Sequence, residues 1–272
     1  MPFIDHMQRN RFECKYIIDE RCACGVRDFI RGHLVRDEHA RARLAWAYPI
    51  YSVYLDSPSL ELFNATVCGH KNRFKLRARY YDDKPASPVF FEIKRRMNDV
   101  IMKSRAAVRR ASVQRLFAGA APQREDLLDH DDPGAFSVLR EFCQLRASVG
   151  AAGRTLVTYS REAWNARDND AVRVTFDRRI AGAWYDNAFP SHQALAVNRP
   201  WVYPSIDNGH GVVLELKFTG CYPRWMEQLA STFNLYRVCM AKYVSCVQAV
   251  GPRRHGVRGE RLVARAPLEA LV

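Results

Sequence analysis

Charged and apolar residues alternate strictly in one stretch of the chain, residues 71–80. From Phe74 onward the even positions are apolar or aromatic. Every odd position is cationic: Lys71, Arg73, Lys75, Arg77 and Arg79. Because successive side chains leave a β-strand on opposite faces, this period of two predicts a strand with one positively charged face. Such a face either deters aggregation at an exposed sheet edge or lines a groove that binds a polyanion.

The same alternation returns along most of the chain. It predicts further strands at residues 11–18, 48–56, 89–96, 101–109, 155–164, 172–177 and 211–218. Apolar residues at helical spacing predict helices at residues 20–35, 60–65, 113–148 with a polar interruption at 122–132, 223–233 and 238–250. Residues 182–211 show little periodicity and are predicted to form a loop.

Cations gather on the polar faces of the predicted strands. They are Lys15, Lys71, Arg73, Lys75, Arg77, Arg79, Lys94, Arg96, Lys103, Arg105, Arg109, Arg161 and Arg173. Acids on the same faces are few: Glu13, Glu92, Asp177 and Glu215. The recurrence favours an α+β fold in which an antiparallel β-barrel or tunnel encloses a basic lumen and helices pack on the outside. An ordinary α+β sheet with one solvated basic face is the alternative.

Composition agrees with an anionic partner. The 272 residues are 48% hydrophobic, enough for a core, and carry a formal net charge of +13. No run is apolar and long enough to span a bilayer, and the N-terminus lacks a secretion signal, so a cytoplasmic protein is expected. The eight cysteines are scattered, which is typical of reduced thiols, and the eight histidines have no ligand-like spacing.

Three motifs carry a resemblance to a known family. They are Gly-His-Lys-Asn-Arg-Phe-Lys-Leu-Arg-Ala-Arg-Tyr at 69–80, Phe-Glu-Ile-Lys-Arg-Arg at 91–96 and Leu-Glu-Leu-Lys-Phe at 214–218. In this order and spacing the chain resembles the catalytic domain of the vacuolar transporter chaperone (VTC) proteins, the polyphosphate polymerases of the triphosphate tunnel superfamily. The resemblance covers residues 9–250 and leaves 251–272 as a basic tail that is expected to be disordered.

The resemblance implies a metal-dependent enzyme that transfers the γ-phosphate of ATP to a growing polyphosphate chain, with Mn²⁺ or Mg²⁺. The residues that it and the lumen pattern assign to catalysis are Arg77, Arg79, Lys94, Arg161, Arg173 and Lys242. Those assigned to phosphate binding are Lys15, Lys75, Lys103, Arg105, Tyr159 and Lys217. Glu215 matches the metal-binding glutamate. Ala241 departs from the family's Ser-Lys-Tyr motif, so one phosphate hydrogen bond is expected to be missing.

ATP and inorganic polyphosphate are the implied partners, and a membrane-protein partner stays open. The family's inositol pyrophosphate-binding domain and membrane helices are not expected in this chain. One alternative is a tunnel triphosphatase, although such enzymes usually carry several lumen glutamates. Another is a non-catalytic binder of nucleic acid or polyphosphate. Phe74, Tyr80 and Phe91 alternate away from the cations, whereas base stacking needs both on one surface, so a specific nucleic acid partner is not expected.

Overall fold

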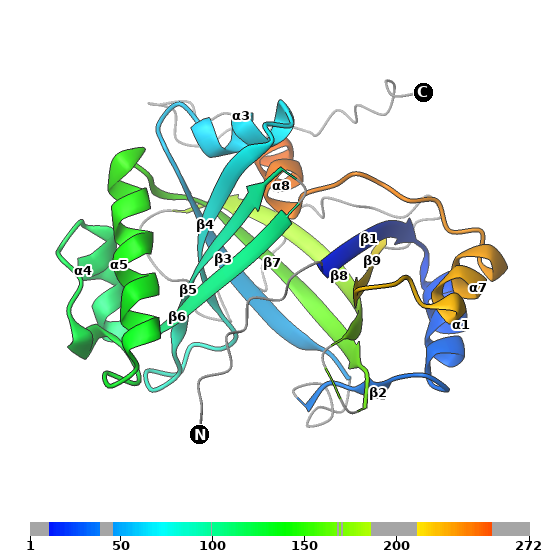
Figure 1. Ribbon diagram of the computed structural model, residues 1–272. Helices are drawn as coiled ribbons and strands as arrows, with labels where there is room; N and C mark the ends of the chain where they lie inside the picture. Colours follow the sequence, from blue (N-terminus) through cyan, green and yellow to red (C-terminus); the bar gives the residue numbers. More distant parts are fainter. Residues whose placement is uncertain are drawn as a thin grey trace.

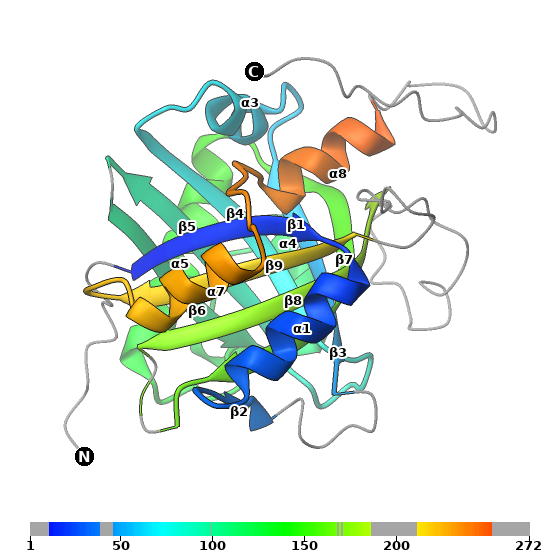
Figure 2. The same ribbon diagram turned by 90° about the vertical axis from the view of Figure 1, so that its right-hand side faces the viewer.

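The strands form one curled antiparallel sheet (Figures 1 and 2). The computed structural model describes residues 11–38, 46–98, 100–167, 169, 171–185 and 211–251. Its nine strands are β1 (Arg11–Ile18), β2 (Val35–Arg36), β3 (Tyr48–Asp56), β4 (Asn72–Tyr80), β5 (Val89–Met97), β6 (Val100–Val108), β7 (Ala152–Asn165), β8 (Val172–Trp184) and β9 (Val212–Thr219). The strand order is β1-β9-β8-β7-β3-β4-β5-β6, and β2 pairs with β7.

The two edge strands, β1 and β6, are not neighbours in this order, so the sheet is curled rather than closed by hydrogen bonds. A side-chain contact bridges part of the gap, because Lys94 Nζ of β5 lies 3.5 Å from Glu13 Oε2 of β1. The predicted α+β fold with an antiparallel tunnel and a basic lumen is therefore confirmed in a curled, open form.

Helices flank the curled sheet. They are α1 (Glu20–Ile30), α3 (Glu61–Val67), α4 (Val113–Phe117), α5 (Pro133–Ser148), α7 (Arg224–Thr232) and α8 (Lys242–Val250), with short 3₁₀ turns at Arg110–Ser112 and Arg124–Asp126. α4 and α5 pack against β4, β5 and β6 around Phe91 and Phe142. α1 and α7 pack against β1, β8 and β9 around Phe176 and Leu216, as Figure 2 shows. Most of the apolar core thus lies outside the sheet and the charged residues gather on the inner face, where α8 also packs Tyr243 and Cys246 against Tyr54, Tyr159 and Val213.

Asp56, which is fully buried at the end of β3, ties three elements together. Its carboxylate accepts hydrogen bonds from the backbone N–H groups of Leu62 and Phe63, each at 2.9 Å, and so caps the first turn of α3. The hydroxyl of Tyr243 donates to the same carboxylate at 2.6 Å. This contact anchors α8 and places the preceding residue, Lys242, at the lumen.

Several element boundaries differ from the sequence-based prediction. α1 ends at Ile30, five residues before the predicted end, because the chain turns and Val35–Arg36 pairs with β7. α8 begins at Lys242 rather than at 238, because the backbone N–H of Val238 donates to the carbonyl of Lys15 and holds the chain extended beside β1. β8 continues to Trp184, into the segment predicted as a loop.

Two residues counted among the strand-face cations lie outside the strands. β4 begins at Asn72, so Lys71 precedes it and is exposed. β6 ends at Val108, so Arg109 follows it. The remainder of the predicted loop, residues 186–210, and all of the predicted tail except Gly251 lie outside the described residues.

Phe142→Ala should lower the free energy of unfolding by about 3–5 kcal/mol, because the ring is fully buried on α5 with its centroid 4.6 Å from that of Phe91. Urea denaturation measures the loss. Arg140→Ala, at an exposed position of the same helix, should change the value by less than about 0.5 kcal/mol. Equal effects of the two substitutions would contradict the packing described for α5.

Candidate functional site

The inner face of the curled sheet gathers the charged residues of seven strands and one helix. Alternation along each strand directs its charged side chains inward, and the curl brings distant strands face to face. Two buried clusters result, one around Glu215 and Asp177, the other around Glu92.

Glu215 on β9 and Asp177 on β8 form the first cluster with three cations. Arg161 binds Asp177 through two parallel bonds, Nε–Oδ1 at 2.6 Å and Nη2–Oδ2 at 2.7 Å. Lys242 Nζ lies 2.7 Å from Asp177 Oδ2 and also contacts Glu215 Oε1. Lys217 Nζ lies 2.6 Å from Glu215 Oε2, where Arg161 Nη2 approaches to 3.5 Å. The two carboxylates therefore hold three cations close together.

The charges of this cluster stabilise one another, and the hydroxyl of Thr175 donates a further hydrogen bond to Glu215 Oε2 at 3.4 Å. Both carboxylates are almost fully buried. Burial opposes ionisation of Glu215, but Lys217, Lys242 and Arg161 outweigh it and hold its pKa well below the usual range. Burial likewise opposes the charge of Lys242, and Asp177 and Glu215 raise its pKa above the ordinary value. Removing one partner would leave a buried charge without compensation.

Glu92 on β5 organises the second cluster. Its Oε2 lies 2.5 Å from Arg77 Nε, its Oε1 lies 2.7 Å from Lys103 Nζ, and Arg79 Nε is 4.0 Å away. Despite burial, these cations lower the pKa of Glu92 well below its usual range. Hydroxyl groups orient the two arginines: Arg77 donates to that of Tyr54 at 3.0 Å, and Arg79 to that of Tyr159 at 3.1 Å. Both guanidinium groups are thereby fixed against the inner wall.

A third group of cations has few acids. Lys15 and Lys94 share Glu13, at 3.1 and 3.5 Å, and Lys15 Nζ also donates to the carbonyl of Met240. Lys75 forms no ion pair with a carboxylate of the described residues. Burial, followed by repulsion from Lys94 and Lys15, lowers the pKa of Lys75 to about 7. Lys75 therefore marks a position where the lumen lacks negative charge.

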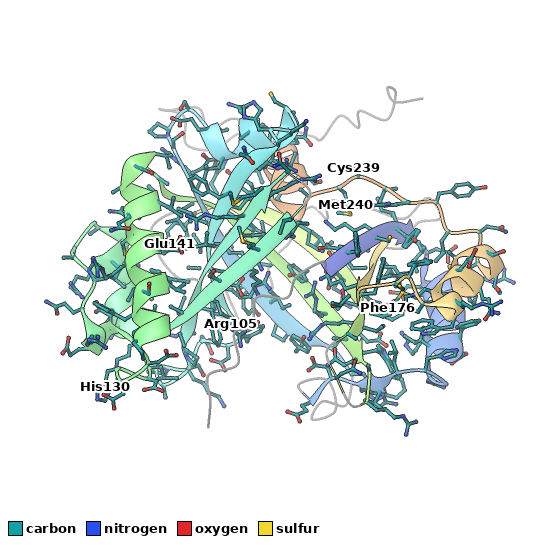
Figure 3. All side chains as sticks on the ribbon, viewed as in Figure 1. Arg105, His130, Glu141, Phe176, Cys239 and Met240 are labelled. Carbon is teal, nitrogen blue, oxygen red and sulfur yellow. The ribbon has the colours of Figure 1, made fainter. Side chains whose placement is uncertain are left out.

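At one end of the lumen, Arg173 donates to Asp37 at 3.0 Å and to the hydroxyl of Tyr48 at 3.3 Å. At the same end Arg105 is exposed, with its guanidinium carbon 4.9 Å from the centroid of Phe90. Figure 3 shows Arg105 in the lower part of the molecule and Cys239 and Met240 in the upper part.

All of the predicted site residues face this lumen or its ends, although their roles stay predictions. The sequence-based reasoning gave no role to Asp177, the partner of Arg161 and Lys242. It also missed Asp37, Tyr54 and Phe90. The alternation of residues 89–96 could have placed Phe90 on the charged face, because it shares the phase of Glu92. Glu13 and Glu92, which the sequence placed among the few acids of the charged faces, pair with neighbouring cations.

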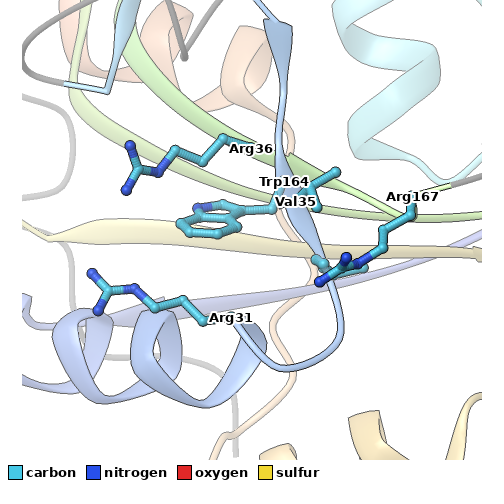
Figure 4. Close-up of a pocket in the computed structure, with 6 residues that line it drawn as sticks. Arg31, Val35, Arg36, Trp164 and Arg167 are labelled. Carbon is cyan, nitrogen blue, oxygen red and sulfur yellow. The ribbon is translucent and has the colours of Figure 1, made fainter.

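A separate pocket of about 330 Å³ lies beside β2, outside the two clusters (Figure 4). Arg31, Arg36 and Arg167 surround its apolar floor, which Trp164 and Leu34 contribute to. Arg36 stacks on Trp46, with its guanidinium carbon 3.6 Å from the ring centroid. None of these residues was predicted as part of the site.

The described residues contain no group of three or more His, Cys, Asp or Glu side chains that could hold a metal ion by themselves. Glu215 can still offer one carboxylate, and Mg²⁺ commonly binds through one or two carboxylates with phosphate oxygens and water. The donor set therefore fits a metal that arrives with a phosphate ligand. It does not fit a cage made by the protein alone.

Comparison with protein-family models matches residues 10–250 to the VTC domain. The chain belongs to the VTC domain family. Membership confirms the resemblance drawn from the sequence motifs and assigns the VTC chain to the tunnel-type enzymes that act on triphosphates. Such domains generally depend on a divalent metal ion. No curated protein matches the VTC chain.

Solved structures of low sequence identity are similar to the VTC chain. A candidate adenylate cyclase from Bacillus halodurans has 11% identity and a TM-score of 0.47, covering 86% of this chain and 96% of its own. One from Vibrio parahaemolyticus has 11% identity and a TM-score of 0.43, with 88% and 98% covered. A candidate adenylyl cyclase from Hippeastrum, described as having a dominant triphosphatase activity, has 8% identity and a TM-score of 0.48, with 90% and 97% covered. Within the described part of the VTC chain, no helix has the length and apolarity to cross a membrane.

Lys75→Met should stabilise the ligand-free VTC chain and weaken its binding of inorganic triphosphate. Removing the poorly compensated ammonium should raise the free energy of unfolding at pH 7 by roughly 1 to 4 kcal/mol. Losing a charge-assisted contact should weaken triphosphate binding about 10- to 100-fold. Urea denaturation and calorimetry measure the two effects. Lys71→Met, at the exposed position before β4, is the matched control. It should change the free energy of unfolding and the affinity for triphosphate only slightly. Destabilisation by Lys75→Met would contradict this account.

Triphosphate binding at pH 8 should take up protons. The pKa of Lys75, about 7, is lower in the folded protein than in the unfolded chain, so its destabilising effect grows as the pH falls from about 10.5 to about 7 and is complete below that range. A bound anion reverses this shift and protonates the amine. Calorimetry in buffers of different ionisation heat counts the protons. Lys75→Met should reduce the uptake, and an unchanged count would show that Lys75 does not titrate on binding.

Proposed function

We propose that this VTC chain is a polyphosphate polymerase that transfers the γ-phosphoryl group of ATP to the end of a polyphosphate chain held in the lumen. The observation that carries the proposal is the excess of cations along the lumen beyond its buried carboxylates. Among the described residues, Lys75 has no carboxylate partner, and Lys15 and Lys94 share a single one. A lumen of this kind favours a long anion that spans both clusters over a small one that occupies a single cluster.

Phosphoryl transfer needs positioning and charge neutralisation more than covalent help from the protein. In the proposed reaction, an ionised oxygen of the terminal phosphate of the polymer attacks the γ-phosphorus of ATP. A new P–O bond forms, the bond from the γ-phosphorus to the β,γ-bridging oxygen breaks, and ADP leaves with the electron pair. The attacking oxygen carries no proton, so the reaction needs no general base.

The arginines of the two clusters have the geometry for this task. Arg77, Arg79 and Arg161 can each present a planar fork to phosphate oxygens. Asp177 positions Arg161 and Lys242 by holding both at bonding distance before substrate arrives. Arg173 extends the row of arginines toward the end of the lumen marked by Asp37. Lys15, Lys94 and Lys242 add point charges that suit any orientation of the phosphate.

Glu215 is the proposed metal-binding carboxylate, with Mn²⁺ or Mg²⁺ as the ion. A bound divalent ion would neutralise charge on the phosphate oxygens. For Glu215 to bind it, Lys217 or Lys242 must release a carboxylate oxygen. The incoming triphosphate supplies the alternative partner for that ammonium group. Substrate and metal binding are therefore expected to depend on each other.

The test is incubation of purified protein with ATP and Mn²⁺, followed by gel analysis of the products. Long polyphosphate and ADP are expected. Release of free phosphate without polymer would instead favour a triphosphatase, and tight binding of polyphosphate without ATP turnover would favour a non-catalytic binder.

Glu215→Gln should reduce polymer synthesis at least about 100-fold while circular dichroism shows a folded protein. The matched control is Glu162→Gln. Glu162 is another buried carboxylate, but it lies on the outer face of β7 and binds Arg27 and Arg178. Polymer synthesis should survive this change in the folded variant. Normal turnover by Glu215→Gln would remove Glu215 from the site.

A further inference from the structure

The two ends of the lumen differ in chemistry. At the end where β4 finishes, the inward-facing residues include three rings and one cation: Tyr48, Tyr81, Phe90 and Arg105. We name this end the aromatic mouth. At the end where β4 begins, the inward positions of β4 and β5 hold Arg73, Lys75, Lys94 and Arg96, none of them aromatic. We name this end the cationic mouth.

The aromatic mouth is a connected cluster. The rings of Tyr81 and Phe90 meet edge to face with centroids 5.9 Å apart. The ring centroids of Tyr48 and Tyr81 are 6.2 Å apart. Arg105 covers Phe90 at 4.9 Å. Tyr48 is buried, whereas Tyr81 and Phe90 are half-buried and Arg105 is exposed. The cluster therefore keeps two rings and one guanidinium accessible from the lumen end.

Strand register joins these rings to the phosphate-binding arginines. Phe90 is the direct partner of Arg79 in the β4–β5 ladder. Tyr81 directly follows the end of β4, and its ring meets that of Phe90 on the inward face. A ligand with a flat uncharged part at Tyr81 and Phe90 could thus place attached phosphates on Arg79 and Arg77.

We infer that the aromatic mouth is a nucleobase subsite and that the polymer occupies the lumen toward the cationic mouth. Bases stack on aromatic rings and on arginine guanidinium planes, and they gain little from isolated ammonium groups. Phosphate chains need cations and gain nothing from rings. The inference rests on the proposed function for the identity of the donor as ATP. The inference adds that the nucleotide donor enters at the aromatic mouth and that the polymer lies toward the cationic mouth.

The test compares the binding of an ATP analogue with an imido β,γ-bridge and of inorganic triphosphate, which has no base. Phe90→Ala should weaken the binding of the analogue about tenfold and the binding of triphosphate less than twofold, as measured by calorimetry. Arg105→Ala should weaken the binding of the analogue more than it weakens the binding of triphosphate. Tyr236→Ala, at an 83% exposed ring, is the control and should alter neither ligand.

Equal weakening of both ligands by Phe90→Ala, or no weakening of the analogue, would overturn the subsite. If Phe90→Ala does not fold, Phe90→Leu keeps the apolar volume without the ring, and the same comparison applies. Arg73→Ala should weaken a long polyphosphate and leave the ratio of analogue to triphosphate affinity unchanged. A change in that ratio would overturn the assignment of the two mouths.

These outcomes are independent of the polymerase test. A protein that makes no polymer but prefers the analogue through Phe90 would retain the nucleobase subsite and lose the proposed function. A protein that makes polymer but shows no such preference would support the proposed function and overturn the nucleobase subsite.

Discussion

Repulsion among the cations that share the lumen is the constraint on which the rest of the structure depends. Lysines and arginines from opposite walls face one another, so without compensation the lysines would lose their protons and the arginines would turn apart. Glu92, Asp177 and Glu215 provide that compensation from buried positions. They hold the arginines in place but leave Lys75 unbalanced, with its pKa lowered to about 7.

This arrangement inverts the usual relation between a curled sheet and its core. A small barrel normally fills its interior with apolar side chains. Here the apolar faces of the strands point outward, so α5 and α4 on one side and α1 and α7 on the other must bury them. Because the interior is charged, the fold needs these helices to bury the apolar strand faces. α8 has a second task, because its anchorage on Asp56 through Tyr243 presents Lys242 to Glu215 and Asp177.

The charged clusters and the aromatic mouth divide the lumen into regions of different preference. The forked donors of Arg77 and Arg161 match the geometry of phosphate oxygens. The ammonium groups of the lysines can bind such oxygens without a fixed orientation. The half-buried rings of Tyr81 and Phe90 at one mouth, and the lysines and arginines of β4 and β5 at the other, make the passage asymmetric. Under the proposed nucleobase subsite, this asymmetry is what distinguishes a nucleotide from a bare phosphate chain.

The chain alone was sufficient to predict the alternating strands, the basic inner face and the family. Those features are local, because a period of two or a motif such as residues 91–96 is visible without a partner strand. The predicted site residues also came together, since the phase of each strand decides which side chains face inward.

Only the tertiary structure decided which charges meet. Asp56 and Tyr243 are 187 positions apart, and Arg173 and Asp37 are 136 apart, so no local pattern could join them. The pairing of β4 with β5 likewise brought Phe90 and Tyr81 together at one mouth and left Lys75 without a carboxylate partner among the described residues. Contacts of this kind depend on strand order and register, which arise from the packing of the whole sheet rather than from any single segment.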